Sequence, residues 1–173
     1  ETHIRELEEA IDQHRDSRPA VTGVRVMVSG IQAPPRRILE AIDACGLVVA
    51  SNDMATMART YASSPEPCPD VYGYLGRFYS AHHPCTTILP SSDLRLENLR
   101  SVIRRRRIRG FIVFAEKFCE YEYFEIPQIS SMLAEEGVKT LVVEMAADDE
   151  ENLMPHITRI EAFAETLTHG TGG

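Results

Sequence analysis

The sequence predicts an α/β protein: a three-layer sandwich around a four-stranded parallel, doubly wound sheet. Four short apolar segments rich in β-branched residues are typical of strands, and they lie at 24–29, 47–51, 111–116 and 138–144. Each is followed by a segment with apolar residues at helical spacing. Because no hairpin turn joins any two of the strands, the connections are crossovers and the sheet is parallel.

Proline, glycine and capping residues divide the chain between these strands. Pro34 and Pro35 suit the first turn of a helix, where a missing N–H costs nothing, and Gly46 ends that helix. After the second strand, we expect a helix to open at Met54 with Asn52 or Asp53 as its N-cap. Further helices are predicted at 4–14, 71–79, 126–136 and 151–167, with a long helix capped by Asp93 and loops at 63–70 and 81–92.

The composition is that of a globular protein of one domain. The 173 residues are 43% hydrophobic and 25% charged, and they can bury most of their apolar surface. We expect a single α/β domain over 1–173, with a helical lead-in at 1–22, a core at 23–168 and a mobile tail at 169–173. No internal repeat is visible.

Charge and hydropathy exclude two classes of partner. The net charge of −8 gives no electrostatic support for nucleic-acid binding. No apolar run approaches the roughly 20 residues of a membrane span, and the first residues lack the basic start and apolar segment of a signal peptide. The four cysteines form no CxxC pair, so we expect reduced thiols or isolated ligands rather than a disulfide framework, in a cytoplasmic protein.

A single cysteine follows the third strand. The run from Phe111 to Ala115 predicts an inner strand covered on both faces, and Cys119 lies just beyond its polar end. Open parallel sheets bind ligands in the crevice outside the carboxyl ends of their strands. Cys119 is therefore a candidate for chemistry, although a free cysteine is also common as a small buried hydrophobe.

Three polar residues lie on the same predicted rim. Ser29, Asp53 and Glu144 stand at or near the ends of the first, second and fourth strands, and we consider them candidate catalytic residues for proton transfer or orientation. For Asp53, capping of the next helix is the favoured alternative. The turn after Ser29 matches neither GxGxxG nor GxxxxGK(S/T), which disfavours a dinucleotide or P-loop site.

Other reactive or charged residues have structural interpretations. Cys85 follows His82 and His83, which are metal-ligating residue types, but their spacing matches no zinc pattern and a loop turn is favoured. The basic run at 104–107 predicts a solvated helix end, with contact to an acidic partner as the alternative. The residues expected to have packing, loop or pairing roles are Cys45, Cys68, Arg159 and Glu161.

Several segments, in this order and spacing, resemble a known family. They are Arg25–Gly30, Gly46–Asp53, Arg59, Gly110–Ile112, Lys117–Cys119, Glu125–Pro127 and Thr158–Glu165. Together they resemble the C-terminal domain of a subunit of the 2-hydroxyacyl-CoA dehydratase and benzoyl-CoA reductase family, which includes 2-hydroxyglutaryl-CoA dehydratase. The resemblance extends from about Val24 to Leu167.

The resemblance implies a subunit of two flavodoxin-like domains that share one 4Fe–4S cluster. Two cluster thiolates would come from the N-terminal domain and one from the C-terminal domain, where Cys119 matches the ligand by its place in the motif. The implied chemistry is one-electron reduction of an acyl-CoA or aryl-CoA thioester to a ketyl radical, followed by elimination of the 2-hydroxyl and a β-hydrogen or by ring reduction. The implied partners are a homologous second subunit and an ATP-hydrolysing iron–sulfur activator protein. Residues 1–173 alone are expected to hold no cluster and to be inactive.

Two alternatives from other classes stay open. The chain could be a flavodoxin-like module that binds a flavin or another small ligand, with phosphate held by the loops after the first two strands. It could also be a non-catalytic domain that docks subunits within a heterodimer.

Overall fold

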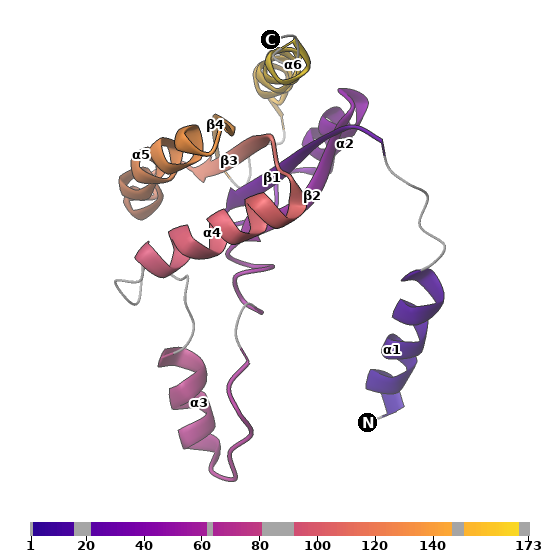
Figure 1. Cartoon of the computed structure of the whole chain (residues 1–173), viewed down its shortest axis with the longest axis vertical. Coiled ribbons are helices and arrows are strands. Elements are labelled where there is room, and N and C mark those ends of the chain that lie inside the picture. The colour runs from indigo at the N-terminus through magenta and orange to yellow at the C-terminus, as the bar shows by residue number, and fades with distance from the viewer. Residues whose placement is uncertain (1, 16–21, 62–63, 81–91, 147–150, 170–173) are drawn as a thin grey trace.

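The structure is a computed structural model, and it describes residues 2–15, 22–61, 64–80, 92–146 and 151–169. Figure 1 shows how the elements are arranged. In chain order they are α1 (Thr2–Arg15), β1 (Val24–Gly30), α2 (Arg36–Ala44), β2 (Leu47–Met54), α3 (Val71–Ser80), α4 (Ser92–Arg106), β3 (Gly110–Glu116), α5 (Glu120–Glu135), β4 (Lys139–Met145) and α6 (Met154–His169).

The described strands form one sheet in the order β2-β1-β3-β4, and every pairing is parallel. This confirms the predicted parallel sheet. The two inner strands are β1 and β3, and β3 is buried from Gly110 to Ala115, as expected for a strand covered on both faces. The register sets Ser29 of β1 beside Asp53 of β2 and Val113 of β3.

Helices cover both faces of the sheet, which confirms the three-layer, doubly wound fold. On one face, Ile38 of α2 and Ile160 of α6 are fully buried in a core shared with Val26. On the other face, Leu99 of α4 and Leu133 of α5 are fully buried in a second core. Each such side chain stabilises the fold by about 1.5 to 3 kcal/mol relative to an exposed one.

Two helices lie apart from this sandwich. Figure 1 shows α1 and α3 standing away from the sheet. The predicted apolar stripe of α1 is present but exposed, since Ile4, Leu7 and Ile11 each leave about 60% of their surface in solvent. Leu75 of α3 is also exposed. Neither helix adds a residue to the two described cores.

The segment after β2 corrects one prediction. β2 continues to Met54, and residues 55–61 form turns, so the helix predicted to open at Met54 is wrong. The backbone N–H of Ala55 donates to the carbonyl of Gly30 at 2.9 Å, which ties this turn to the tip of β1. Asn52 Oδ1 accepts from the N–H groups of Met54 and Ala58, so it organises the turn as a cap would. Asp53 caps nothing because it is buried in the sheet.

Helix starts account for the other corrections. α5 begins at Glu120 rather than Ile126, and Pro127, which resembles a first-turn proline, lies inside it. α4 begins at Ser92, so Asp93 is within the helix, and α6 begins at Met154. Predictions for Cys85, His82, His83 and the last four residues fall outside the described residues.

The strand β4 forms one edge of the sheet. Arg159 of α6 does not pair with Glu161 in the contacts described, but donates from Nη2 to the backbone carbonyl of Val142 at 2.6 Å. Lys139, at the start of the strand, is exposed.

None of the helices in the described ranges has the length and apolar character that crossing a lipid bilayer requires.

Candidate functional site

The carboxyl ends of the strands meet at one edge of the sheet, and all four predicted site residues lie there. The structure divides them into two groups. Ser29 and Asp53 belong to a buried cluster of charges between the sheet and helices α4 and α5. Cys119 and Glu144 lie near Tyr123 of α5.

The first group is centred on Asp53, which is 2% exposed. Ser29 Oγ donates to Asp53 Oδ2 at 2.9 Å across the β1–β2 pairing. Arg95, in the first turn of α4 and 4% exposed, donates to the same oxygen from Nη2 at 2.6 Å and from Nε at 3.2 Å. Arg95 Nη2 also lies 3.2 Å from Ser29 Oγ. One guanidinium thus binds the tips of two strands.

Arg95 also reaches α5. Its Nη1 donates to Glu125 Oε2, so the guanidinium is shared between a strand carboxylate and a helix carboxylate. A second cation, Arg59, is buried beside Asp53, with Nε 3.9 Å from Oδ1 and a hydrogen bond from Nη2 to the Gly30 carbonyl. We call Ser29, Asp53, Arg59, Arg95 and Glu125 the rim cluster; it holds two carboxylates and two guanidinium groups.

Burial and charge act against each other in this region. Burial alone lowers the pKa of Arg95, but the carboxylates of Asp53 and Glu125 outweigh it and raise that pKa above its usual range. For Arg59, burial is the stronger influence and lowers the pKa despite Asp53. Burial also raises the pKa of Glu122. This outweighs the lowering by a hydrogen bond of 3.0 Å that Glu122 Oε2 accepts from the backbone N–H of Glu116.

Cys119 occupies the N-cap position of α5 and is half-buried. Its backbone N–H donates to the carbonyl of Glu116 at 3.1 Å, which closes a tight turn between β3 and α5. Phe118 makes this turn with a φ of +67°, an uncommon conformation for a residue with a side chain, and it is 96% exposed. The cysteine therefore lies where the sequence predicts it, immediately beyond the third strand.

Tyr123 connects Cys119 with the fourth strand. Its backbone N–H lies 3.4 Å from the Cys119 carbonyl. Desolvation and a hydrogen bond from its hydroxyl to the Glu144 carboxylate raise the pKa of Tyr123 to about 12. The phenol is therefore protonated at neutral pH and donates to Glu144, which is exposed.

The described residues supply one thiol at this rim. Cys45 ends α2 at the opposite edge of the sheet, and Cys68 precedes α3. Within the described ranges, no three His, Cys, Asp or Glu side chains converge as metal ligands. Cys119 can therefore supply one thiolate to an iron–sulfur cluster, but these residues do not provide the further thiolates that such a cluster needs.

Sequence reasoning missed Arg95, Glu122, Glu125 and Tyr123 as parts of this region. For Arg95 and Glu122, the sequence does contain a pattern that indicates a buried position. Arg95 precedes the buried Leu99 by four residues, and Glu122 precedes the buried Ile129 by seven, so each lies on the inward stripe of its helix. A charged residue at an inward helical position is rarely fully buried unless paired, so it indicates a partner in the core.

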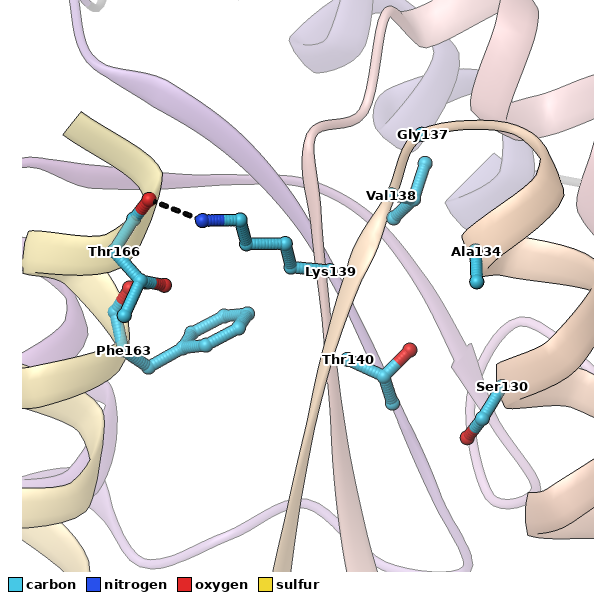
Figure 2. A pocket seen from close by; sticks show the side chains of 8 residues that line it. All are labelled: Ser130, Ala134, Gly137, Val138, Lys139, Thr140, Phe163 and Thr166. Carbon is cyan, nitrogen blue, oxygen red and sulfur yellow. Dashed lines mark hydrogen bonds between the residues drawn. The ribbon is translucent and has the colours of Figure 1, made fainter. Parts of the chain in front are cut away.

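Two pockets bear on the small-ligand alternative. A polar pocket of about 210 Å³, lined partly by Asn52, Arg59 and Asn98, lies near the end of β2. A pocket of about 600 Å³ lies between α5 and α6 at the first residues of β4. Figure 2 shows Lys139 crossing this pocket to the Thr166 carbonyl, a hydrogen bond of 2.6 Å. The second pocket is at the amino end of β4, opposite the edge where such sheets bind ligands.

Comparison with known proteins gives one family and two relatives. The family model described as 2-hydroxyglutaryl-CoA dehydratase, D-component, matches residues 1–167. The chain is 25% identical over 167 residues to the (R)-phenyllactyl-CoA dehydratase beta subunit of Clostridium sporogenes, covering 95% of this chain and 44% of the relative. It is 29% identical over 152 residues to the beta subunit of (R)-2-hydroxyglutaryl-CoA dehydratase of Acidaminococcus fermentans, covering 84% of this chain and 39% of the relative.

The chain therefore spans less than half the length of these two relatives. The family match extends over almost the whole sequence, from the helix α1 to the last turn of α6. It confirms the resemblance inferred from the sequence motifs. The chain belongs to the 2-hydroxyglutaryl-CoA dehydratase D-component family.

Proposed function

We propose that this chain is part of a subunit of a 2-hydroxyacyl-CoA dehydratase, in which Cys119 supplies one thiolate to a 4Fe–4S cluster. The single observation that carries the proposal is the family match over residues 1–167, which includes the turn from β3 into α5 that holds Cys119. The position of this thiol at the carboxyl edge of a parallel sheet supports the assignment. The other cluster ligands would lie outside this chain.

The proposed reaction removes water from a (R)-2-hydroxyacyl-CoA. One electron added to the thioester carbonyl gives a ketyl radical, which expels the 2-hydroxyl as hydroxide. Loss of a β-proton and return of the electron then give the enoyl-CoA, so the reaction is redox-neutral overall. A 4Fe–4S cluster at this edge would supply the single electron. Both relatives are named as dehydratase subunits, which favours dehydration over reduction of an aryl ring.

Residues of the rim would have different parts in this reaction. Glu144 is exposed and accepts a hydrogen bond from the Tyr123 hydroxyl. Of the two predicted carboxylates, Glu144 and Asp53, it is therefore the better placed to take a proton from the substrate. Ser29 and Asp53 are almost fully buried and hydrogen-bonded to each other, so they would act by holding the rim in place. The proposed partners are a homologous second subunit and an ATP-dependent iron–sulfur activator protein.

Replacement of Cys119 with serine in the full-length protein tests the proposal. We expect the Cys119→Ser protein to lose most of its iron and acid-labile sulfide and to lose turnover, because an alkoxide is a poor replacement for a thiolate on iron. Its far-UV circular dichroism should be unchanged, since Cys119 belongs to neither core.

Cys45→Ser and Cys68→Ser are matched controls, because both are half-buried thiols outside the rim. Both control proteins should keep their iron and their activity. Full iron content and full turnover in the Cys119→Ser protein would show that the ligand assignment is wrong.

A further inference from the structure

The first turns of α5 are fixed by two carboxylates that face the sheet. Glu122 and Glu125 are three residues apart and so lie on one side of the helix. Glu122 accepts the backbone N–H of Glu116, the last residue of β3. Glu125 accepts a hydrogen bond from Arg95 Nη1. Both carboxylates anchor the same end of α5, which begins immediately after Cys119.

Arg95 has the central place in this arrangement. The remainder of its guanidinium binds Asp53 and Ser29, at the tips of β2 and β1. The side chain is 4% exposed, so neither of these bonds is weakened by competition with bulk water. The planar fork allows one side chain to bind two carboxylates at a fixed angle, which a lysine cannot reproduce.

The turn before Cys119 is tied to the sheet by two backbone hydrogen bonds of 3.1 Å, from the Lys117 N–H to the Met145 carbonyl and from the Cys119 N–H to the Glu116 carbonyl. Phe118 is 96% exposed, so its side chain does not pack against the protein in the described residues. Because Cys119 is the N-cap of α5, the direction of its side chain depends also on where α5 begins and how firmly that helix is held.

We propose that Arg95 is a positioning residue for Cys119, acting through Glu125 and the first turns of α5. The rim cluster would hold the thiol in one orientation relative to the carboxyl edge of the sheet, before any ligand binds. This inference rests on the proposed role of Cys119 for its consequence in the enzyme, but its geometry can be tested without iron.

Three variants of the full-length, cluster-free, reduced protein test the proposal. Arg95→Met removes the whole link. Glu125→Ala removes only the link to α5 and leaves Arg95 on Asp53; since alanine favours helix, any loosening of α5 cannot come from lost helix propensity. Glu125→Gln can still accept a hydrogen bond from Arg95, so this variant should keep part of the link to α5 and behave between wild type and Glu125→Ala.

Arg104→Met is the matched control. Arg104 also joins α4 to α5, through Glu136, but at the other end of both helices and with a side chain that is 70% exposed. Glu136 is 15% exposed, but solvent reaches the pair through Arg104, and a surface pair of this kind adds little stability. The control therefore removes an α4–α5 ion pair without touching the rim.

Two measurements follow the position of the thiol. Amide hydrogen exchange of the peptide that spans residues 117–126 should accelerate by about tenfold or more in Arg95→Met and Glu125→Ala, since a charged hydrogen bond is lost. The rate of Cys119 alkylation by iodoacetamide should rise by about threefold or more, measured on its own peptide and compared at equal global stability. Arg104→Met should leave both rates at the wild-type value.

Unchanged exchange and alkylation in Glu125→Ala would overturn the proposal, and this variant decides the question if Arg95→Met does not fold. A uniform acceleration of exchange over the whole sheet would also overturn it, because that is the signature of a purely structural role. Reconstituted Glu125→Ala should bind less iron than wild type. If Cys119→Ser keeps its iron while Glu125→Ala changes the alkylation rate, the cluster role fails and the positioning role stands.

Discussion

Arg95 and Asp53 form an ion pair from which water is almost excluded, so each depends on the other. Removing one member of a buried pair typically costs about 3 to 5 kcal/mol, because the remaining charge has no solvent to stabilise it. Replacing both can be nearly neutral. The rim cluster therefore fixes geometry more than it adds net stability, which agrees with its contact, through Glu125, to the helix that begins directly after the proposed cluster ligand.

Glu122 leads to a prediction about pH. Its pKa is raised in the folded protein above the ordinary value of 4.5, chiefly by burial, so the folded state binds this proton more tightly than the unfolded state. The stabilisation is fully present below 4.5 and is lost as the pH rises through the folded value. Relative to Glu122→Gln, the wild-type free energy of unfolding should therefore increase as the pH falls from neutral to below 4.5.

Urea denaturation of both proteins across this pH range measures the difference. Glu120→Gln, on the exposed side of the same turn, corrects for the loss of one negative charge. Parallel stability curves for wild type and Glu122→Gln would show that burial does not raise the pKa of Glu122.

The sequence predicts which residues reach the rim, but it does not predict their partners. Parallel strands end at one edge, so Ser29, Asp53, Cys119 and Glu144 could be assigned there from strand positions alone. The bond between Asp53 and Arg95 joins residues 42 positions apart and depends on how α4 packs on the sheet. That packing follows from the whole core, which local patterns do not encode.

Among the described residues, three helices end with a residue in the left-handed conformation. α2 and α5 use Gly46 and Gly137, with φ of +71° and +72°, and α4 uses Arg107, with φ of +54°. At the end of α4, the N–H of Ile108 donates to the Ile103 carbonyl and completes a Schellman motif. Glycine adopts this conformation without strain, whereas a side chain at the same position costs about 1 kcal/mol or more.

Arg107→Gly should therefore stabilise the protein, by about 1 kcal/mol, because it removes the strain of the left-handed conformation. Arg106→Gly is the matched control: it changes the last residue of α4, in helical conformation, and should destabilise by about 1 kcal/mol or less. Thermal and urea unfolding measure both effects. A destabilised Arg107→Gly protein would mean that the Arg107 side chain makes a contact worth more than the strain.

Element boundaries were predicted well where local chemistry decides them. Gly46 and Gly137 mark helix ends in the sequence, and the structure places both there. The turn at 55–61 was not predicted, because its hydrogen bonds go to the tip of β1 rather than along the segment. The start of α5 was also missed, since Pro127 is usual in a first turn, whereas the bonds that hold the true first turns, from Glu116 to Glu122 and from Arg95 to Glu125, do not show in the local pattern.

The whole chain covers less than half of the relatives that it matches. A protein made of residues 1–173 alone should purify without the brown colour and broad visible absorbance of iron–sulfur charge transfer, because the described residues provide one thiol at the rim. Absorption spectra and iron analysis under anaerobic conditions check this. Stoichiometric iron in such a preparation would contradict the proposal that the other ligands lie outside this chain.

The bond from Arg159 to the Val142 carbonyl has a consequence for behaviour at high concentration. An uncovered strand edge is a template to which another extended chain can add, and repeated addition leads to fibres. The guanidinium occupies a carbonyl that an incoming strand would need, and the exposed Lys139 adds a second positive charge on the same edge. We therefore expect this one side chain of α6 to hinder neighbouring molecules from extending the sheet, and Arg159→Ala to form fibres more readily at high concentration than wild type.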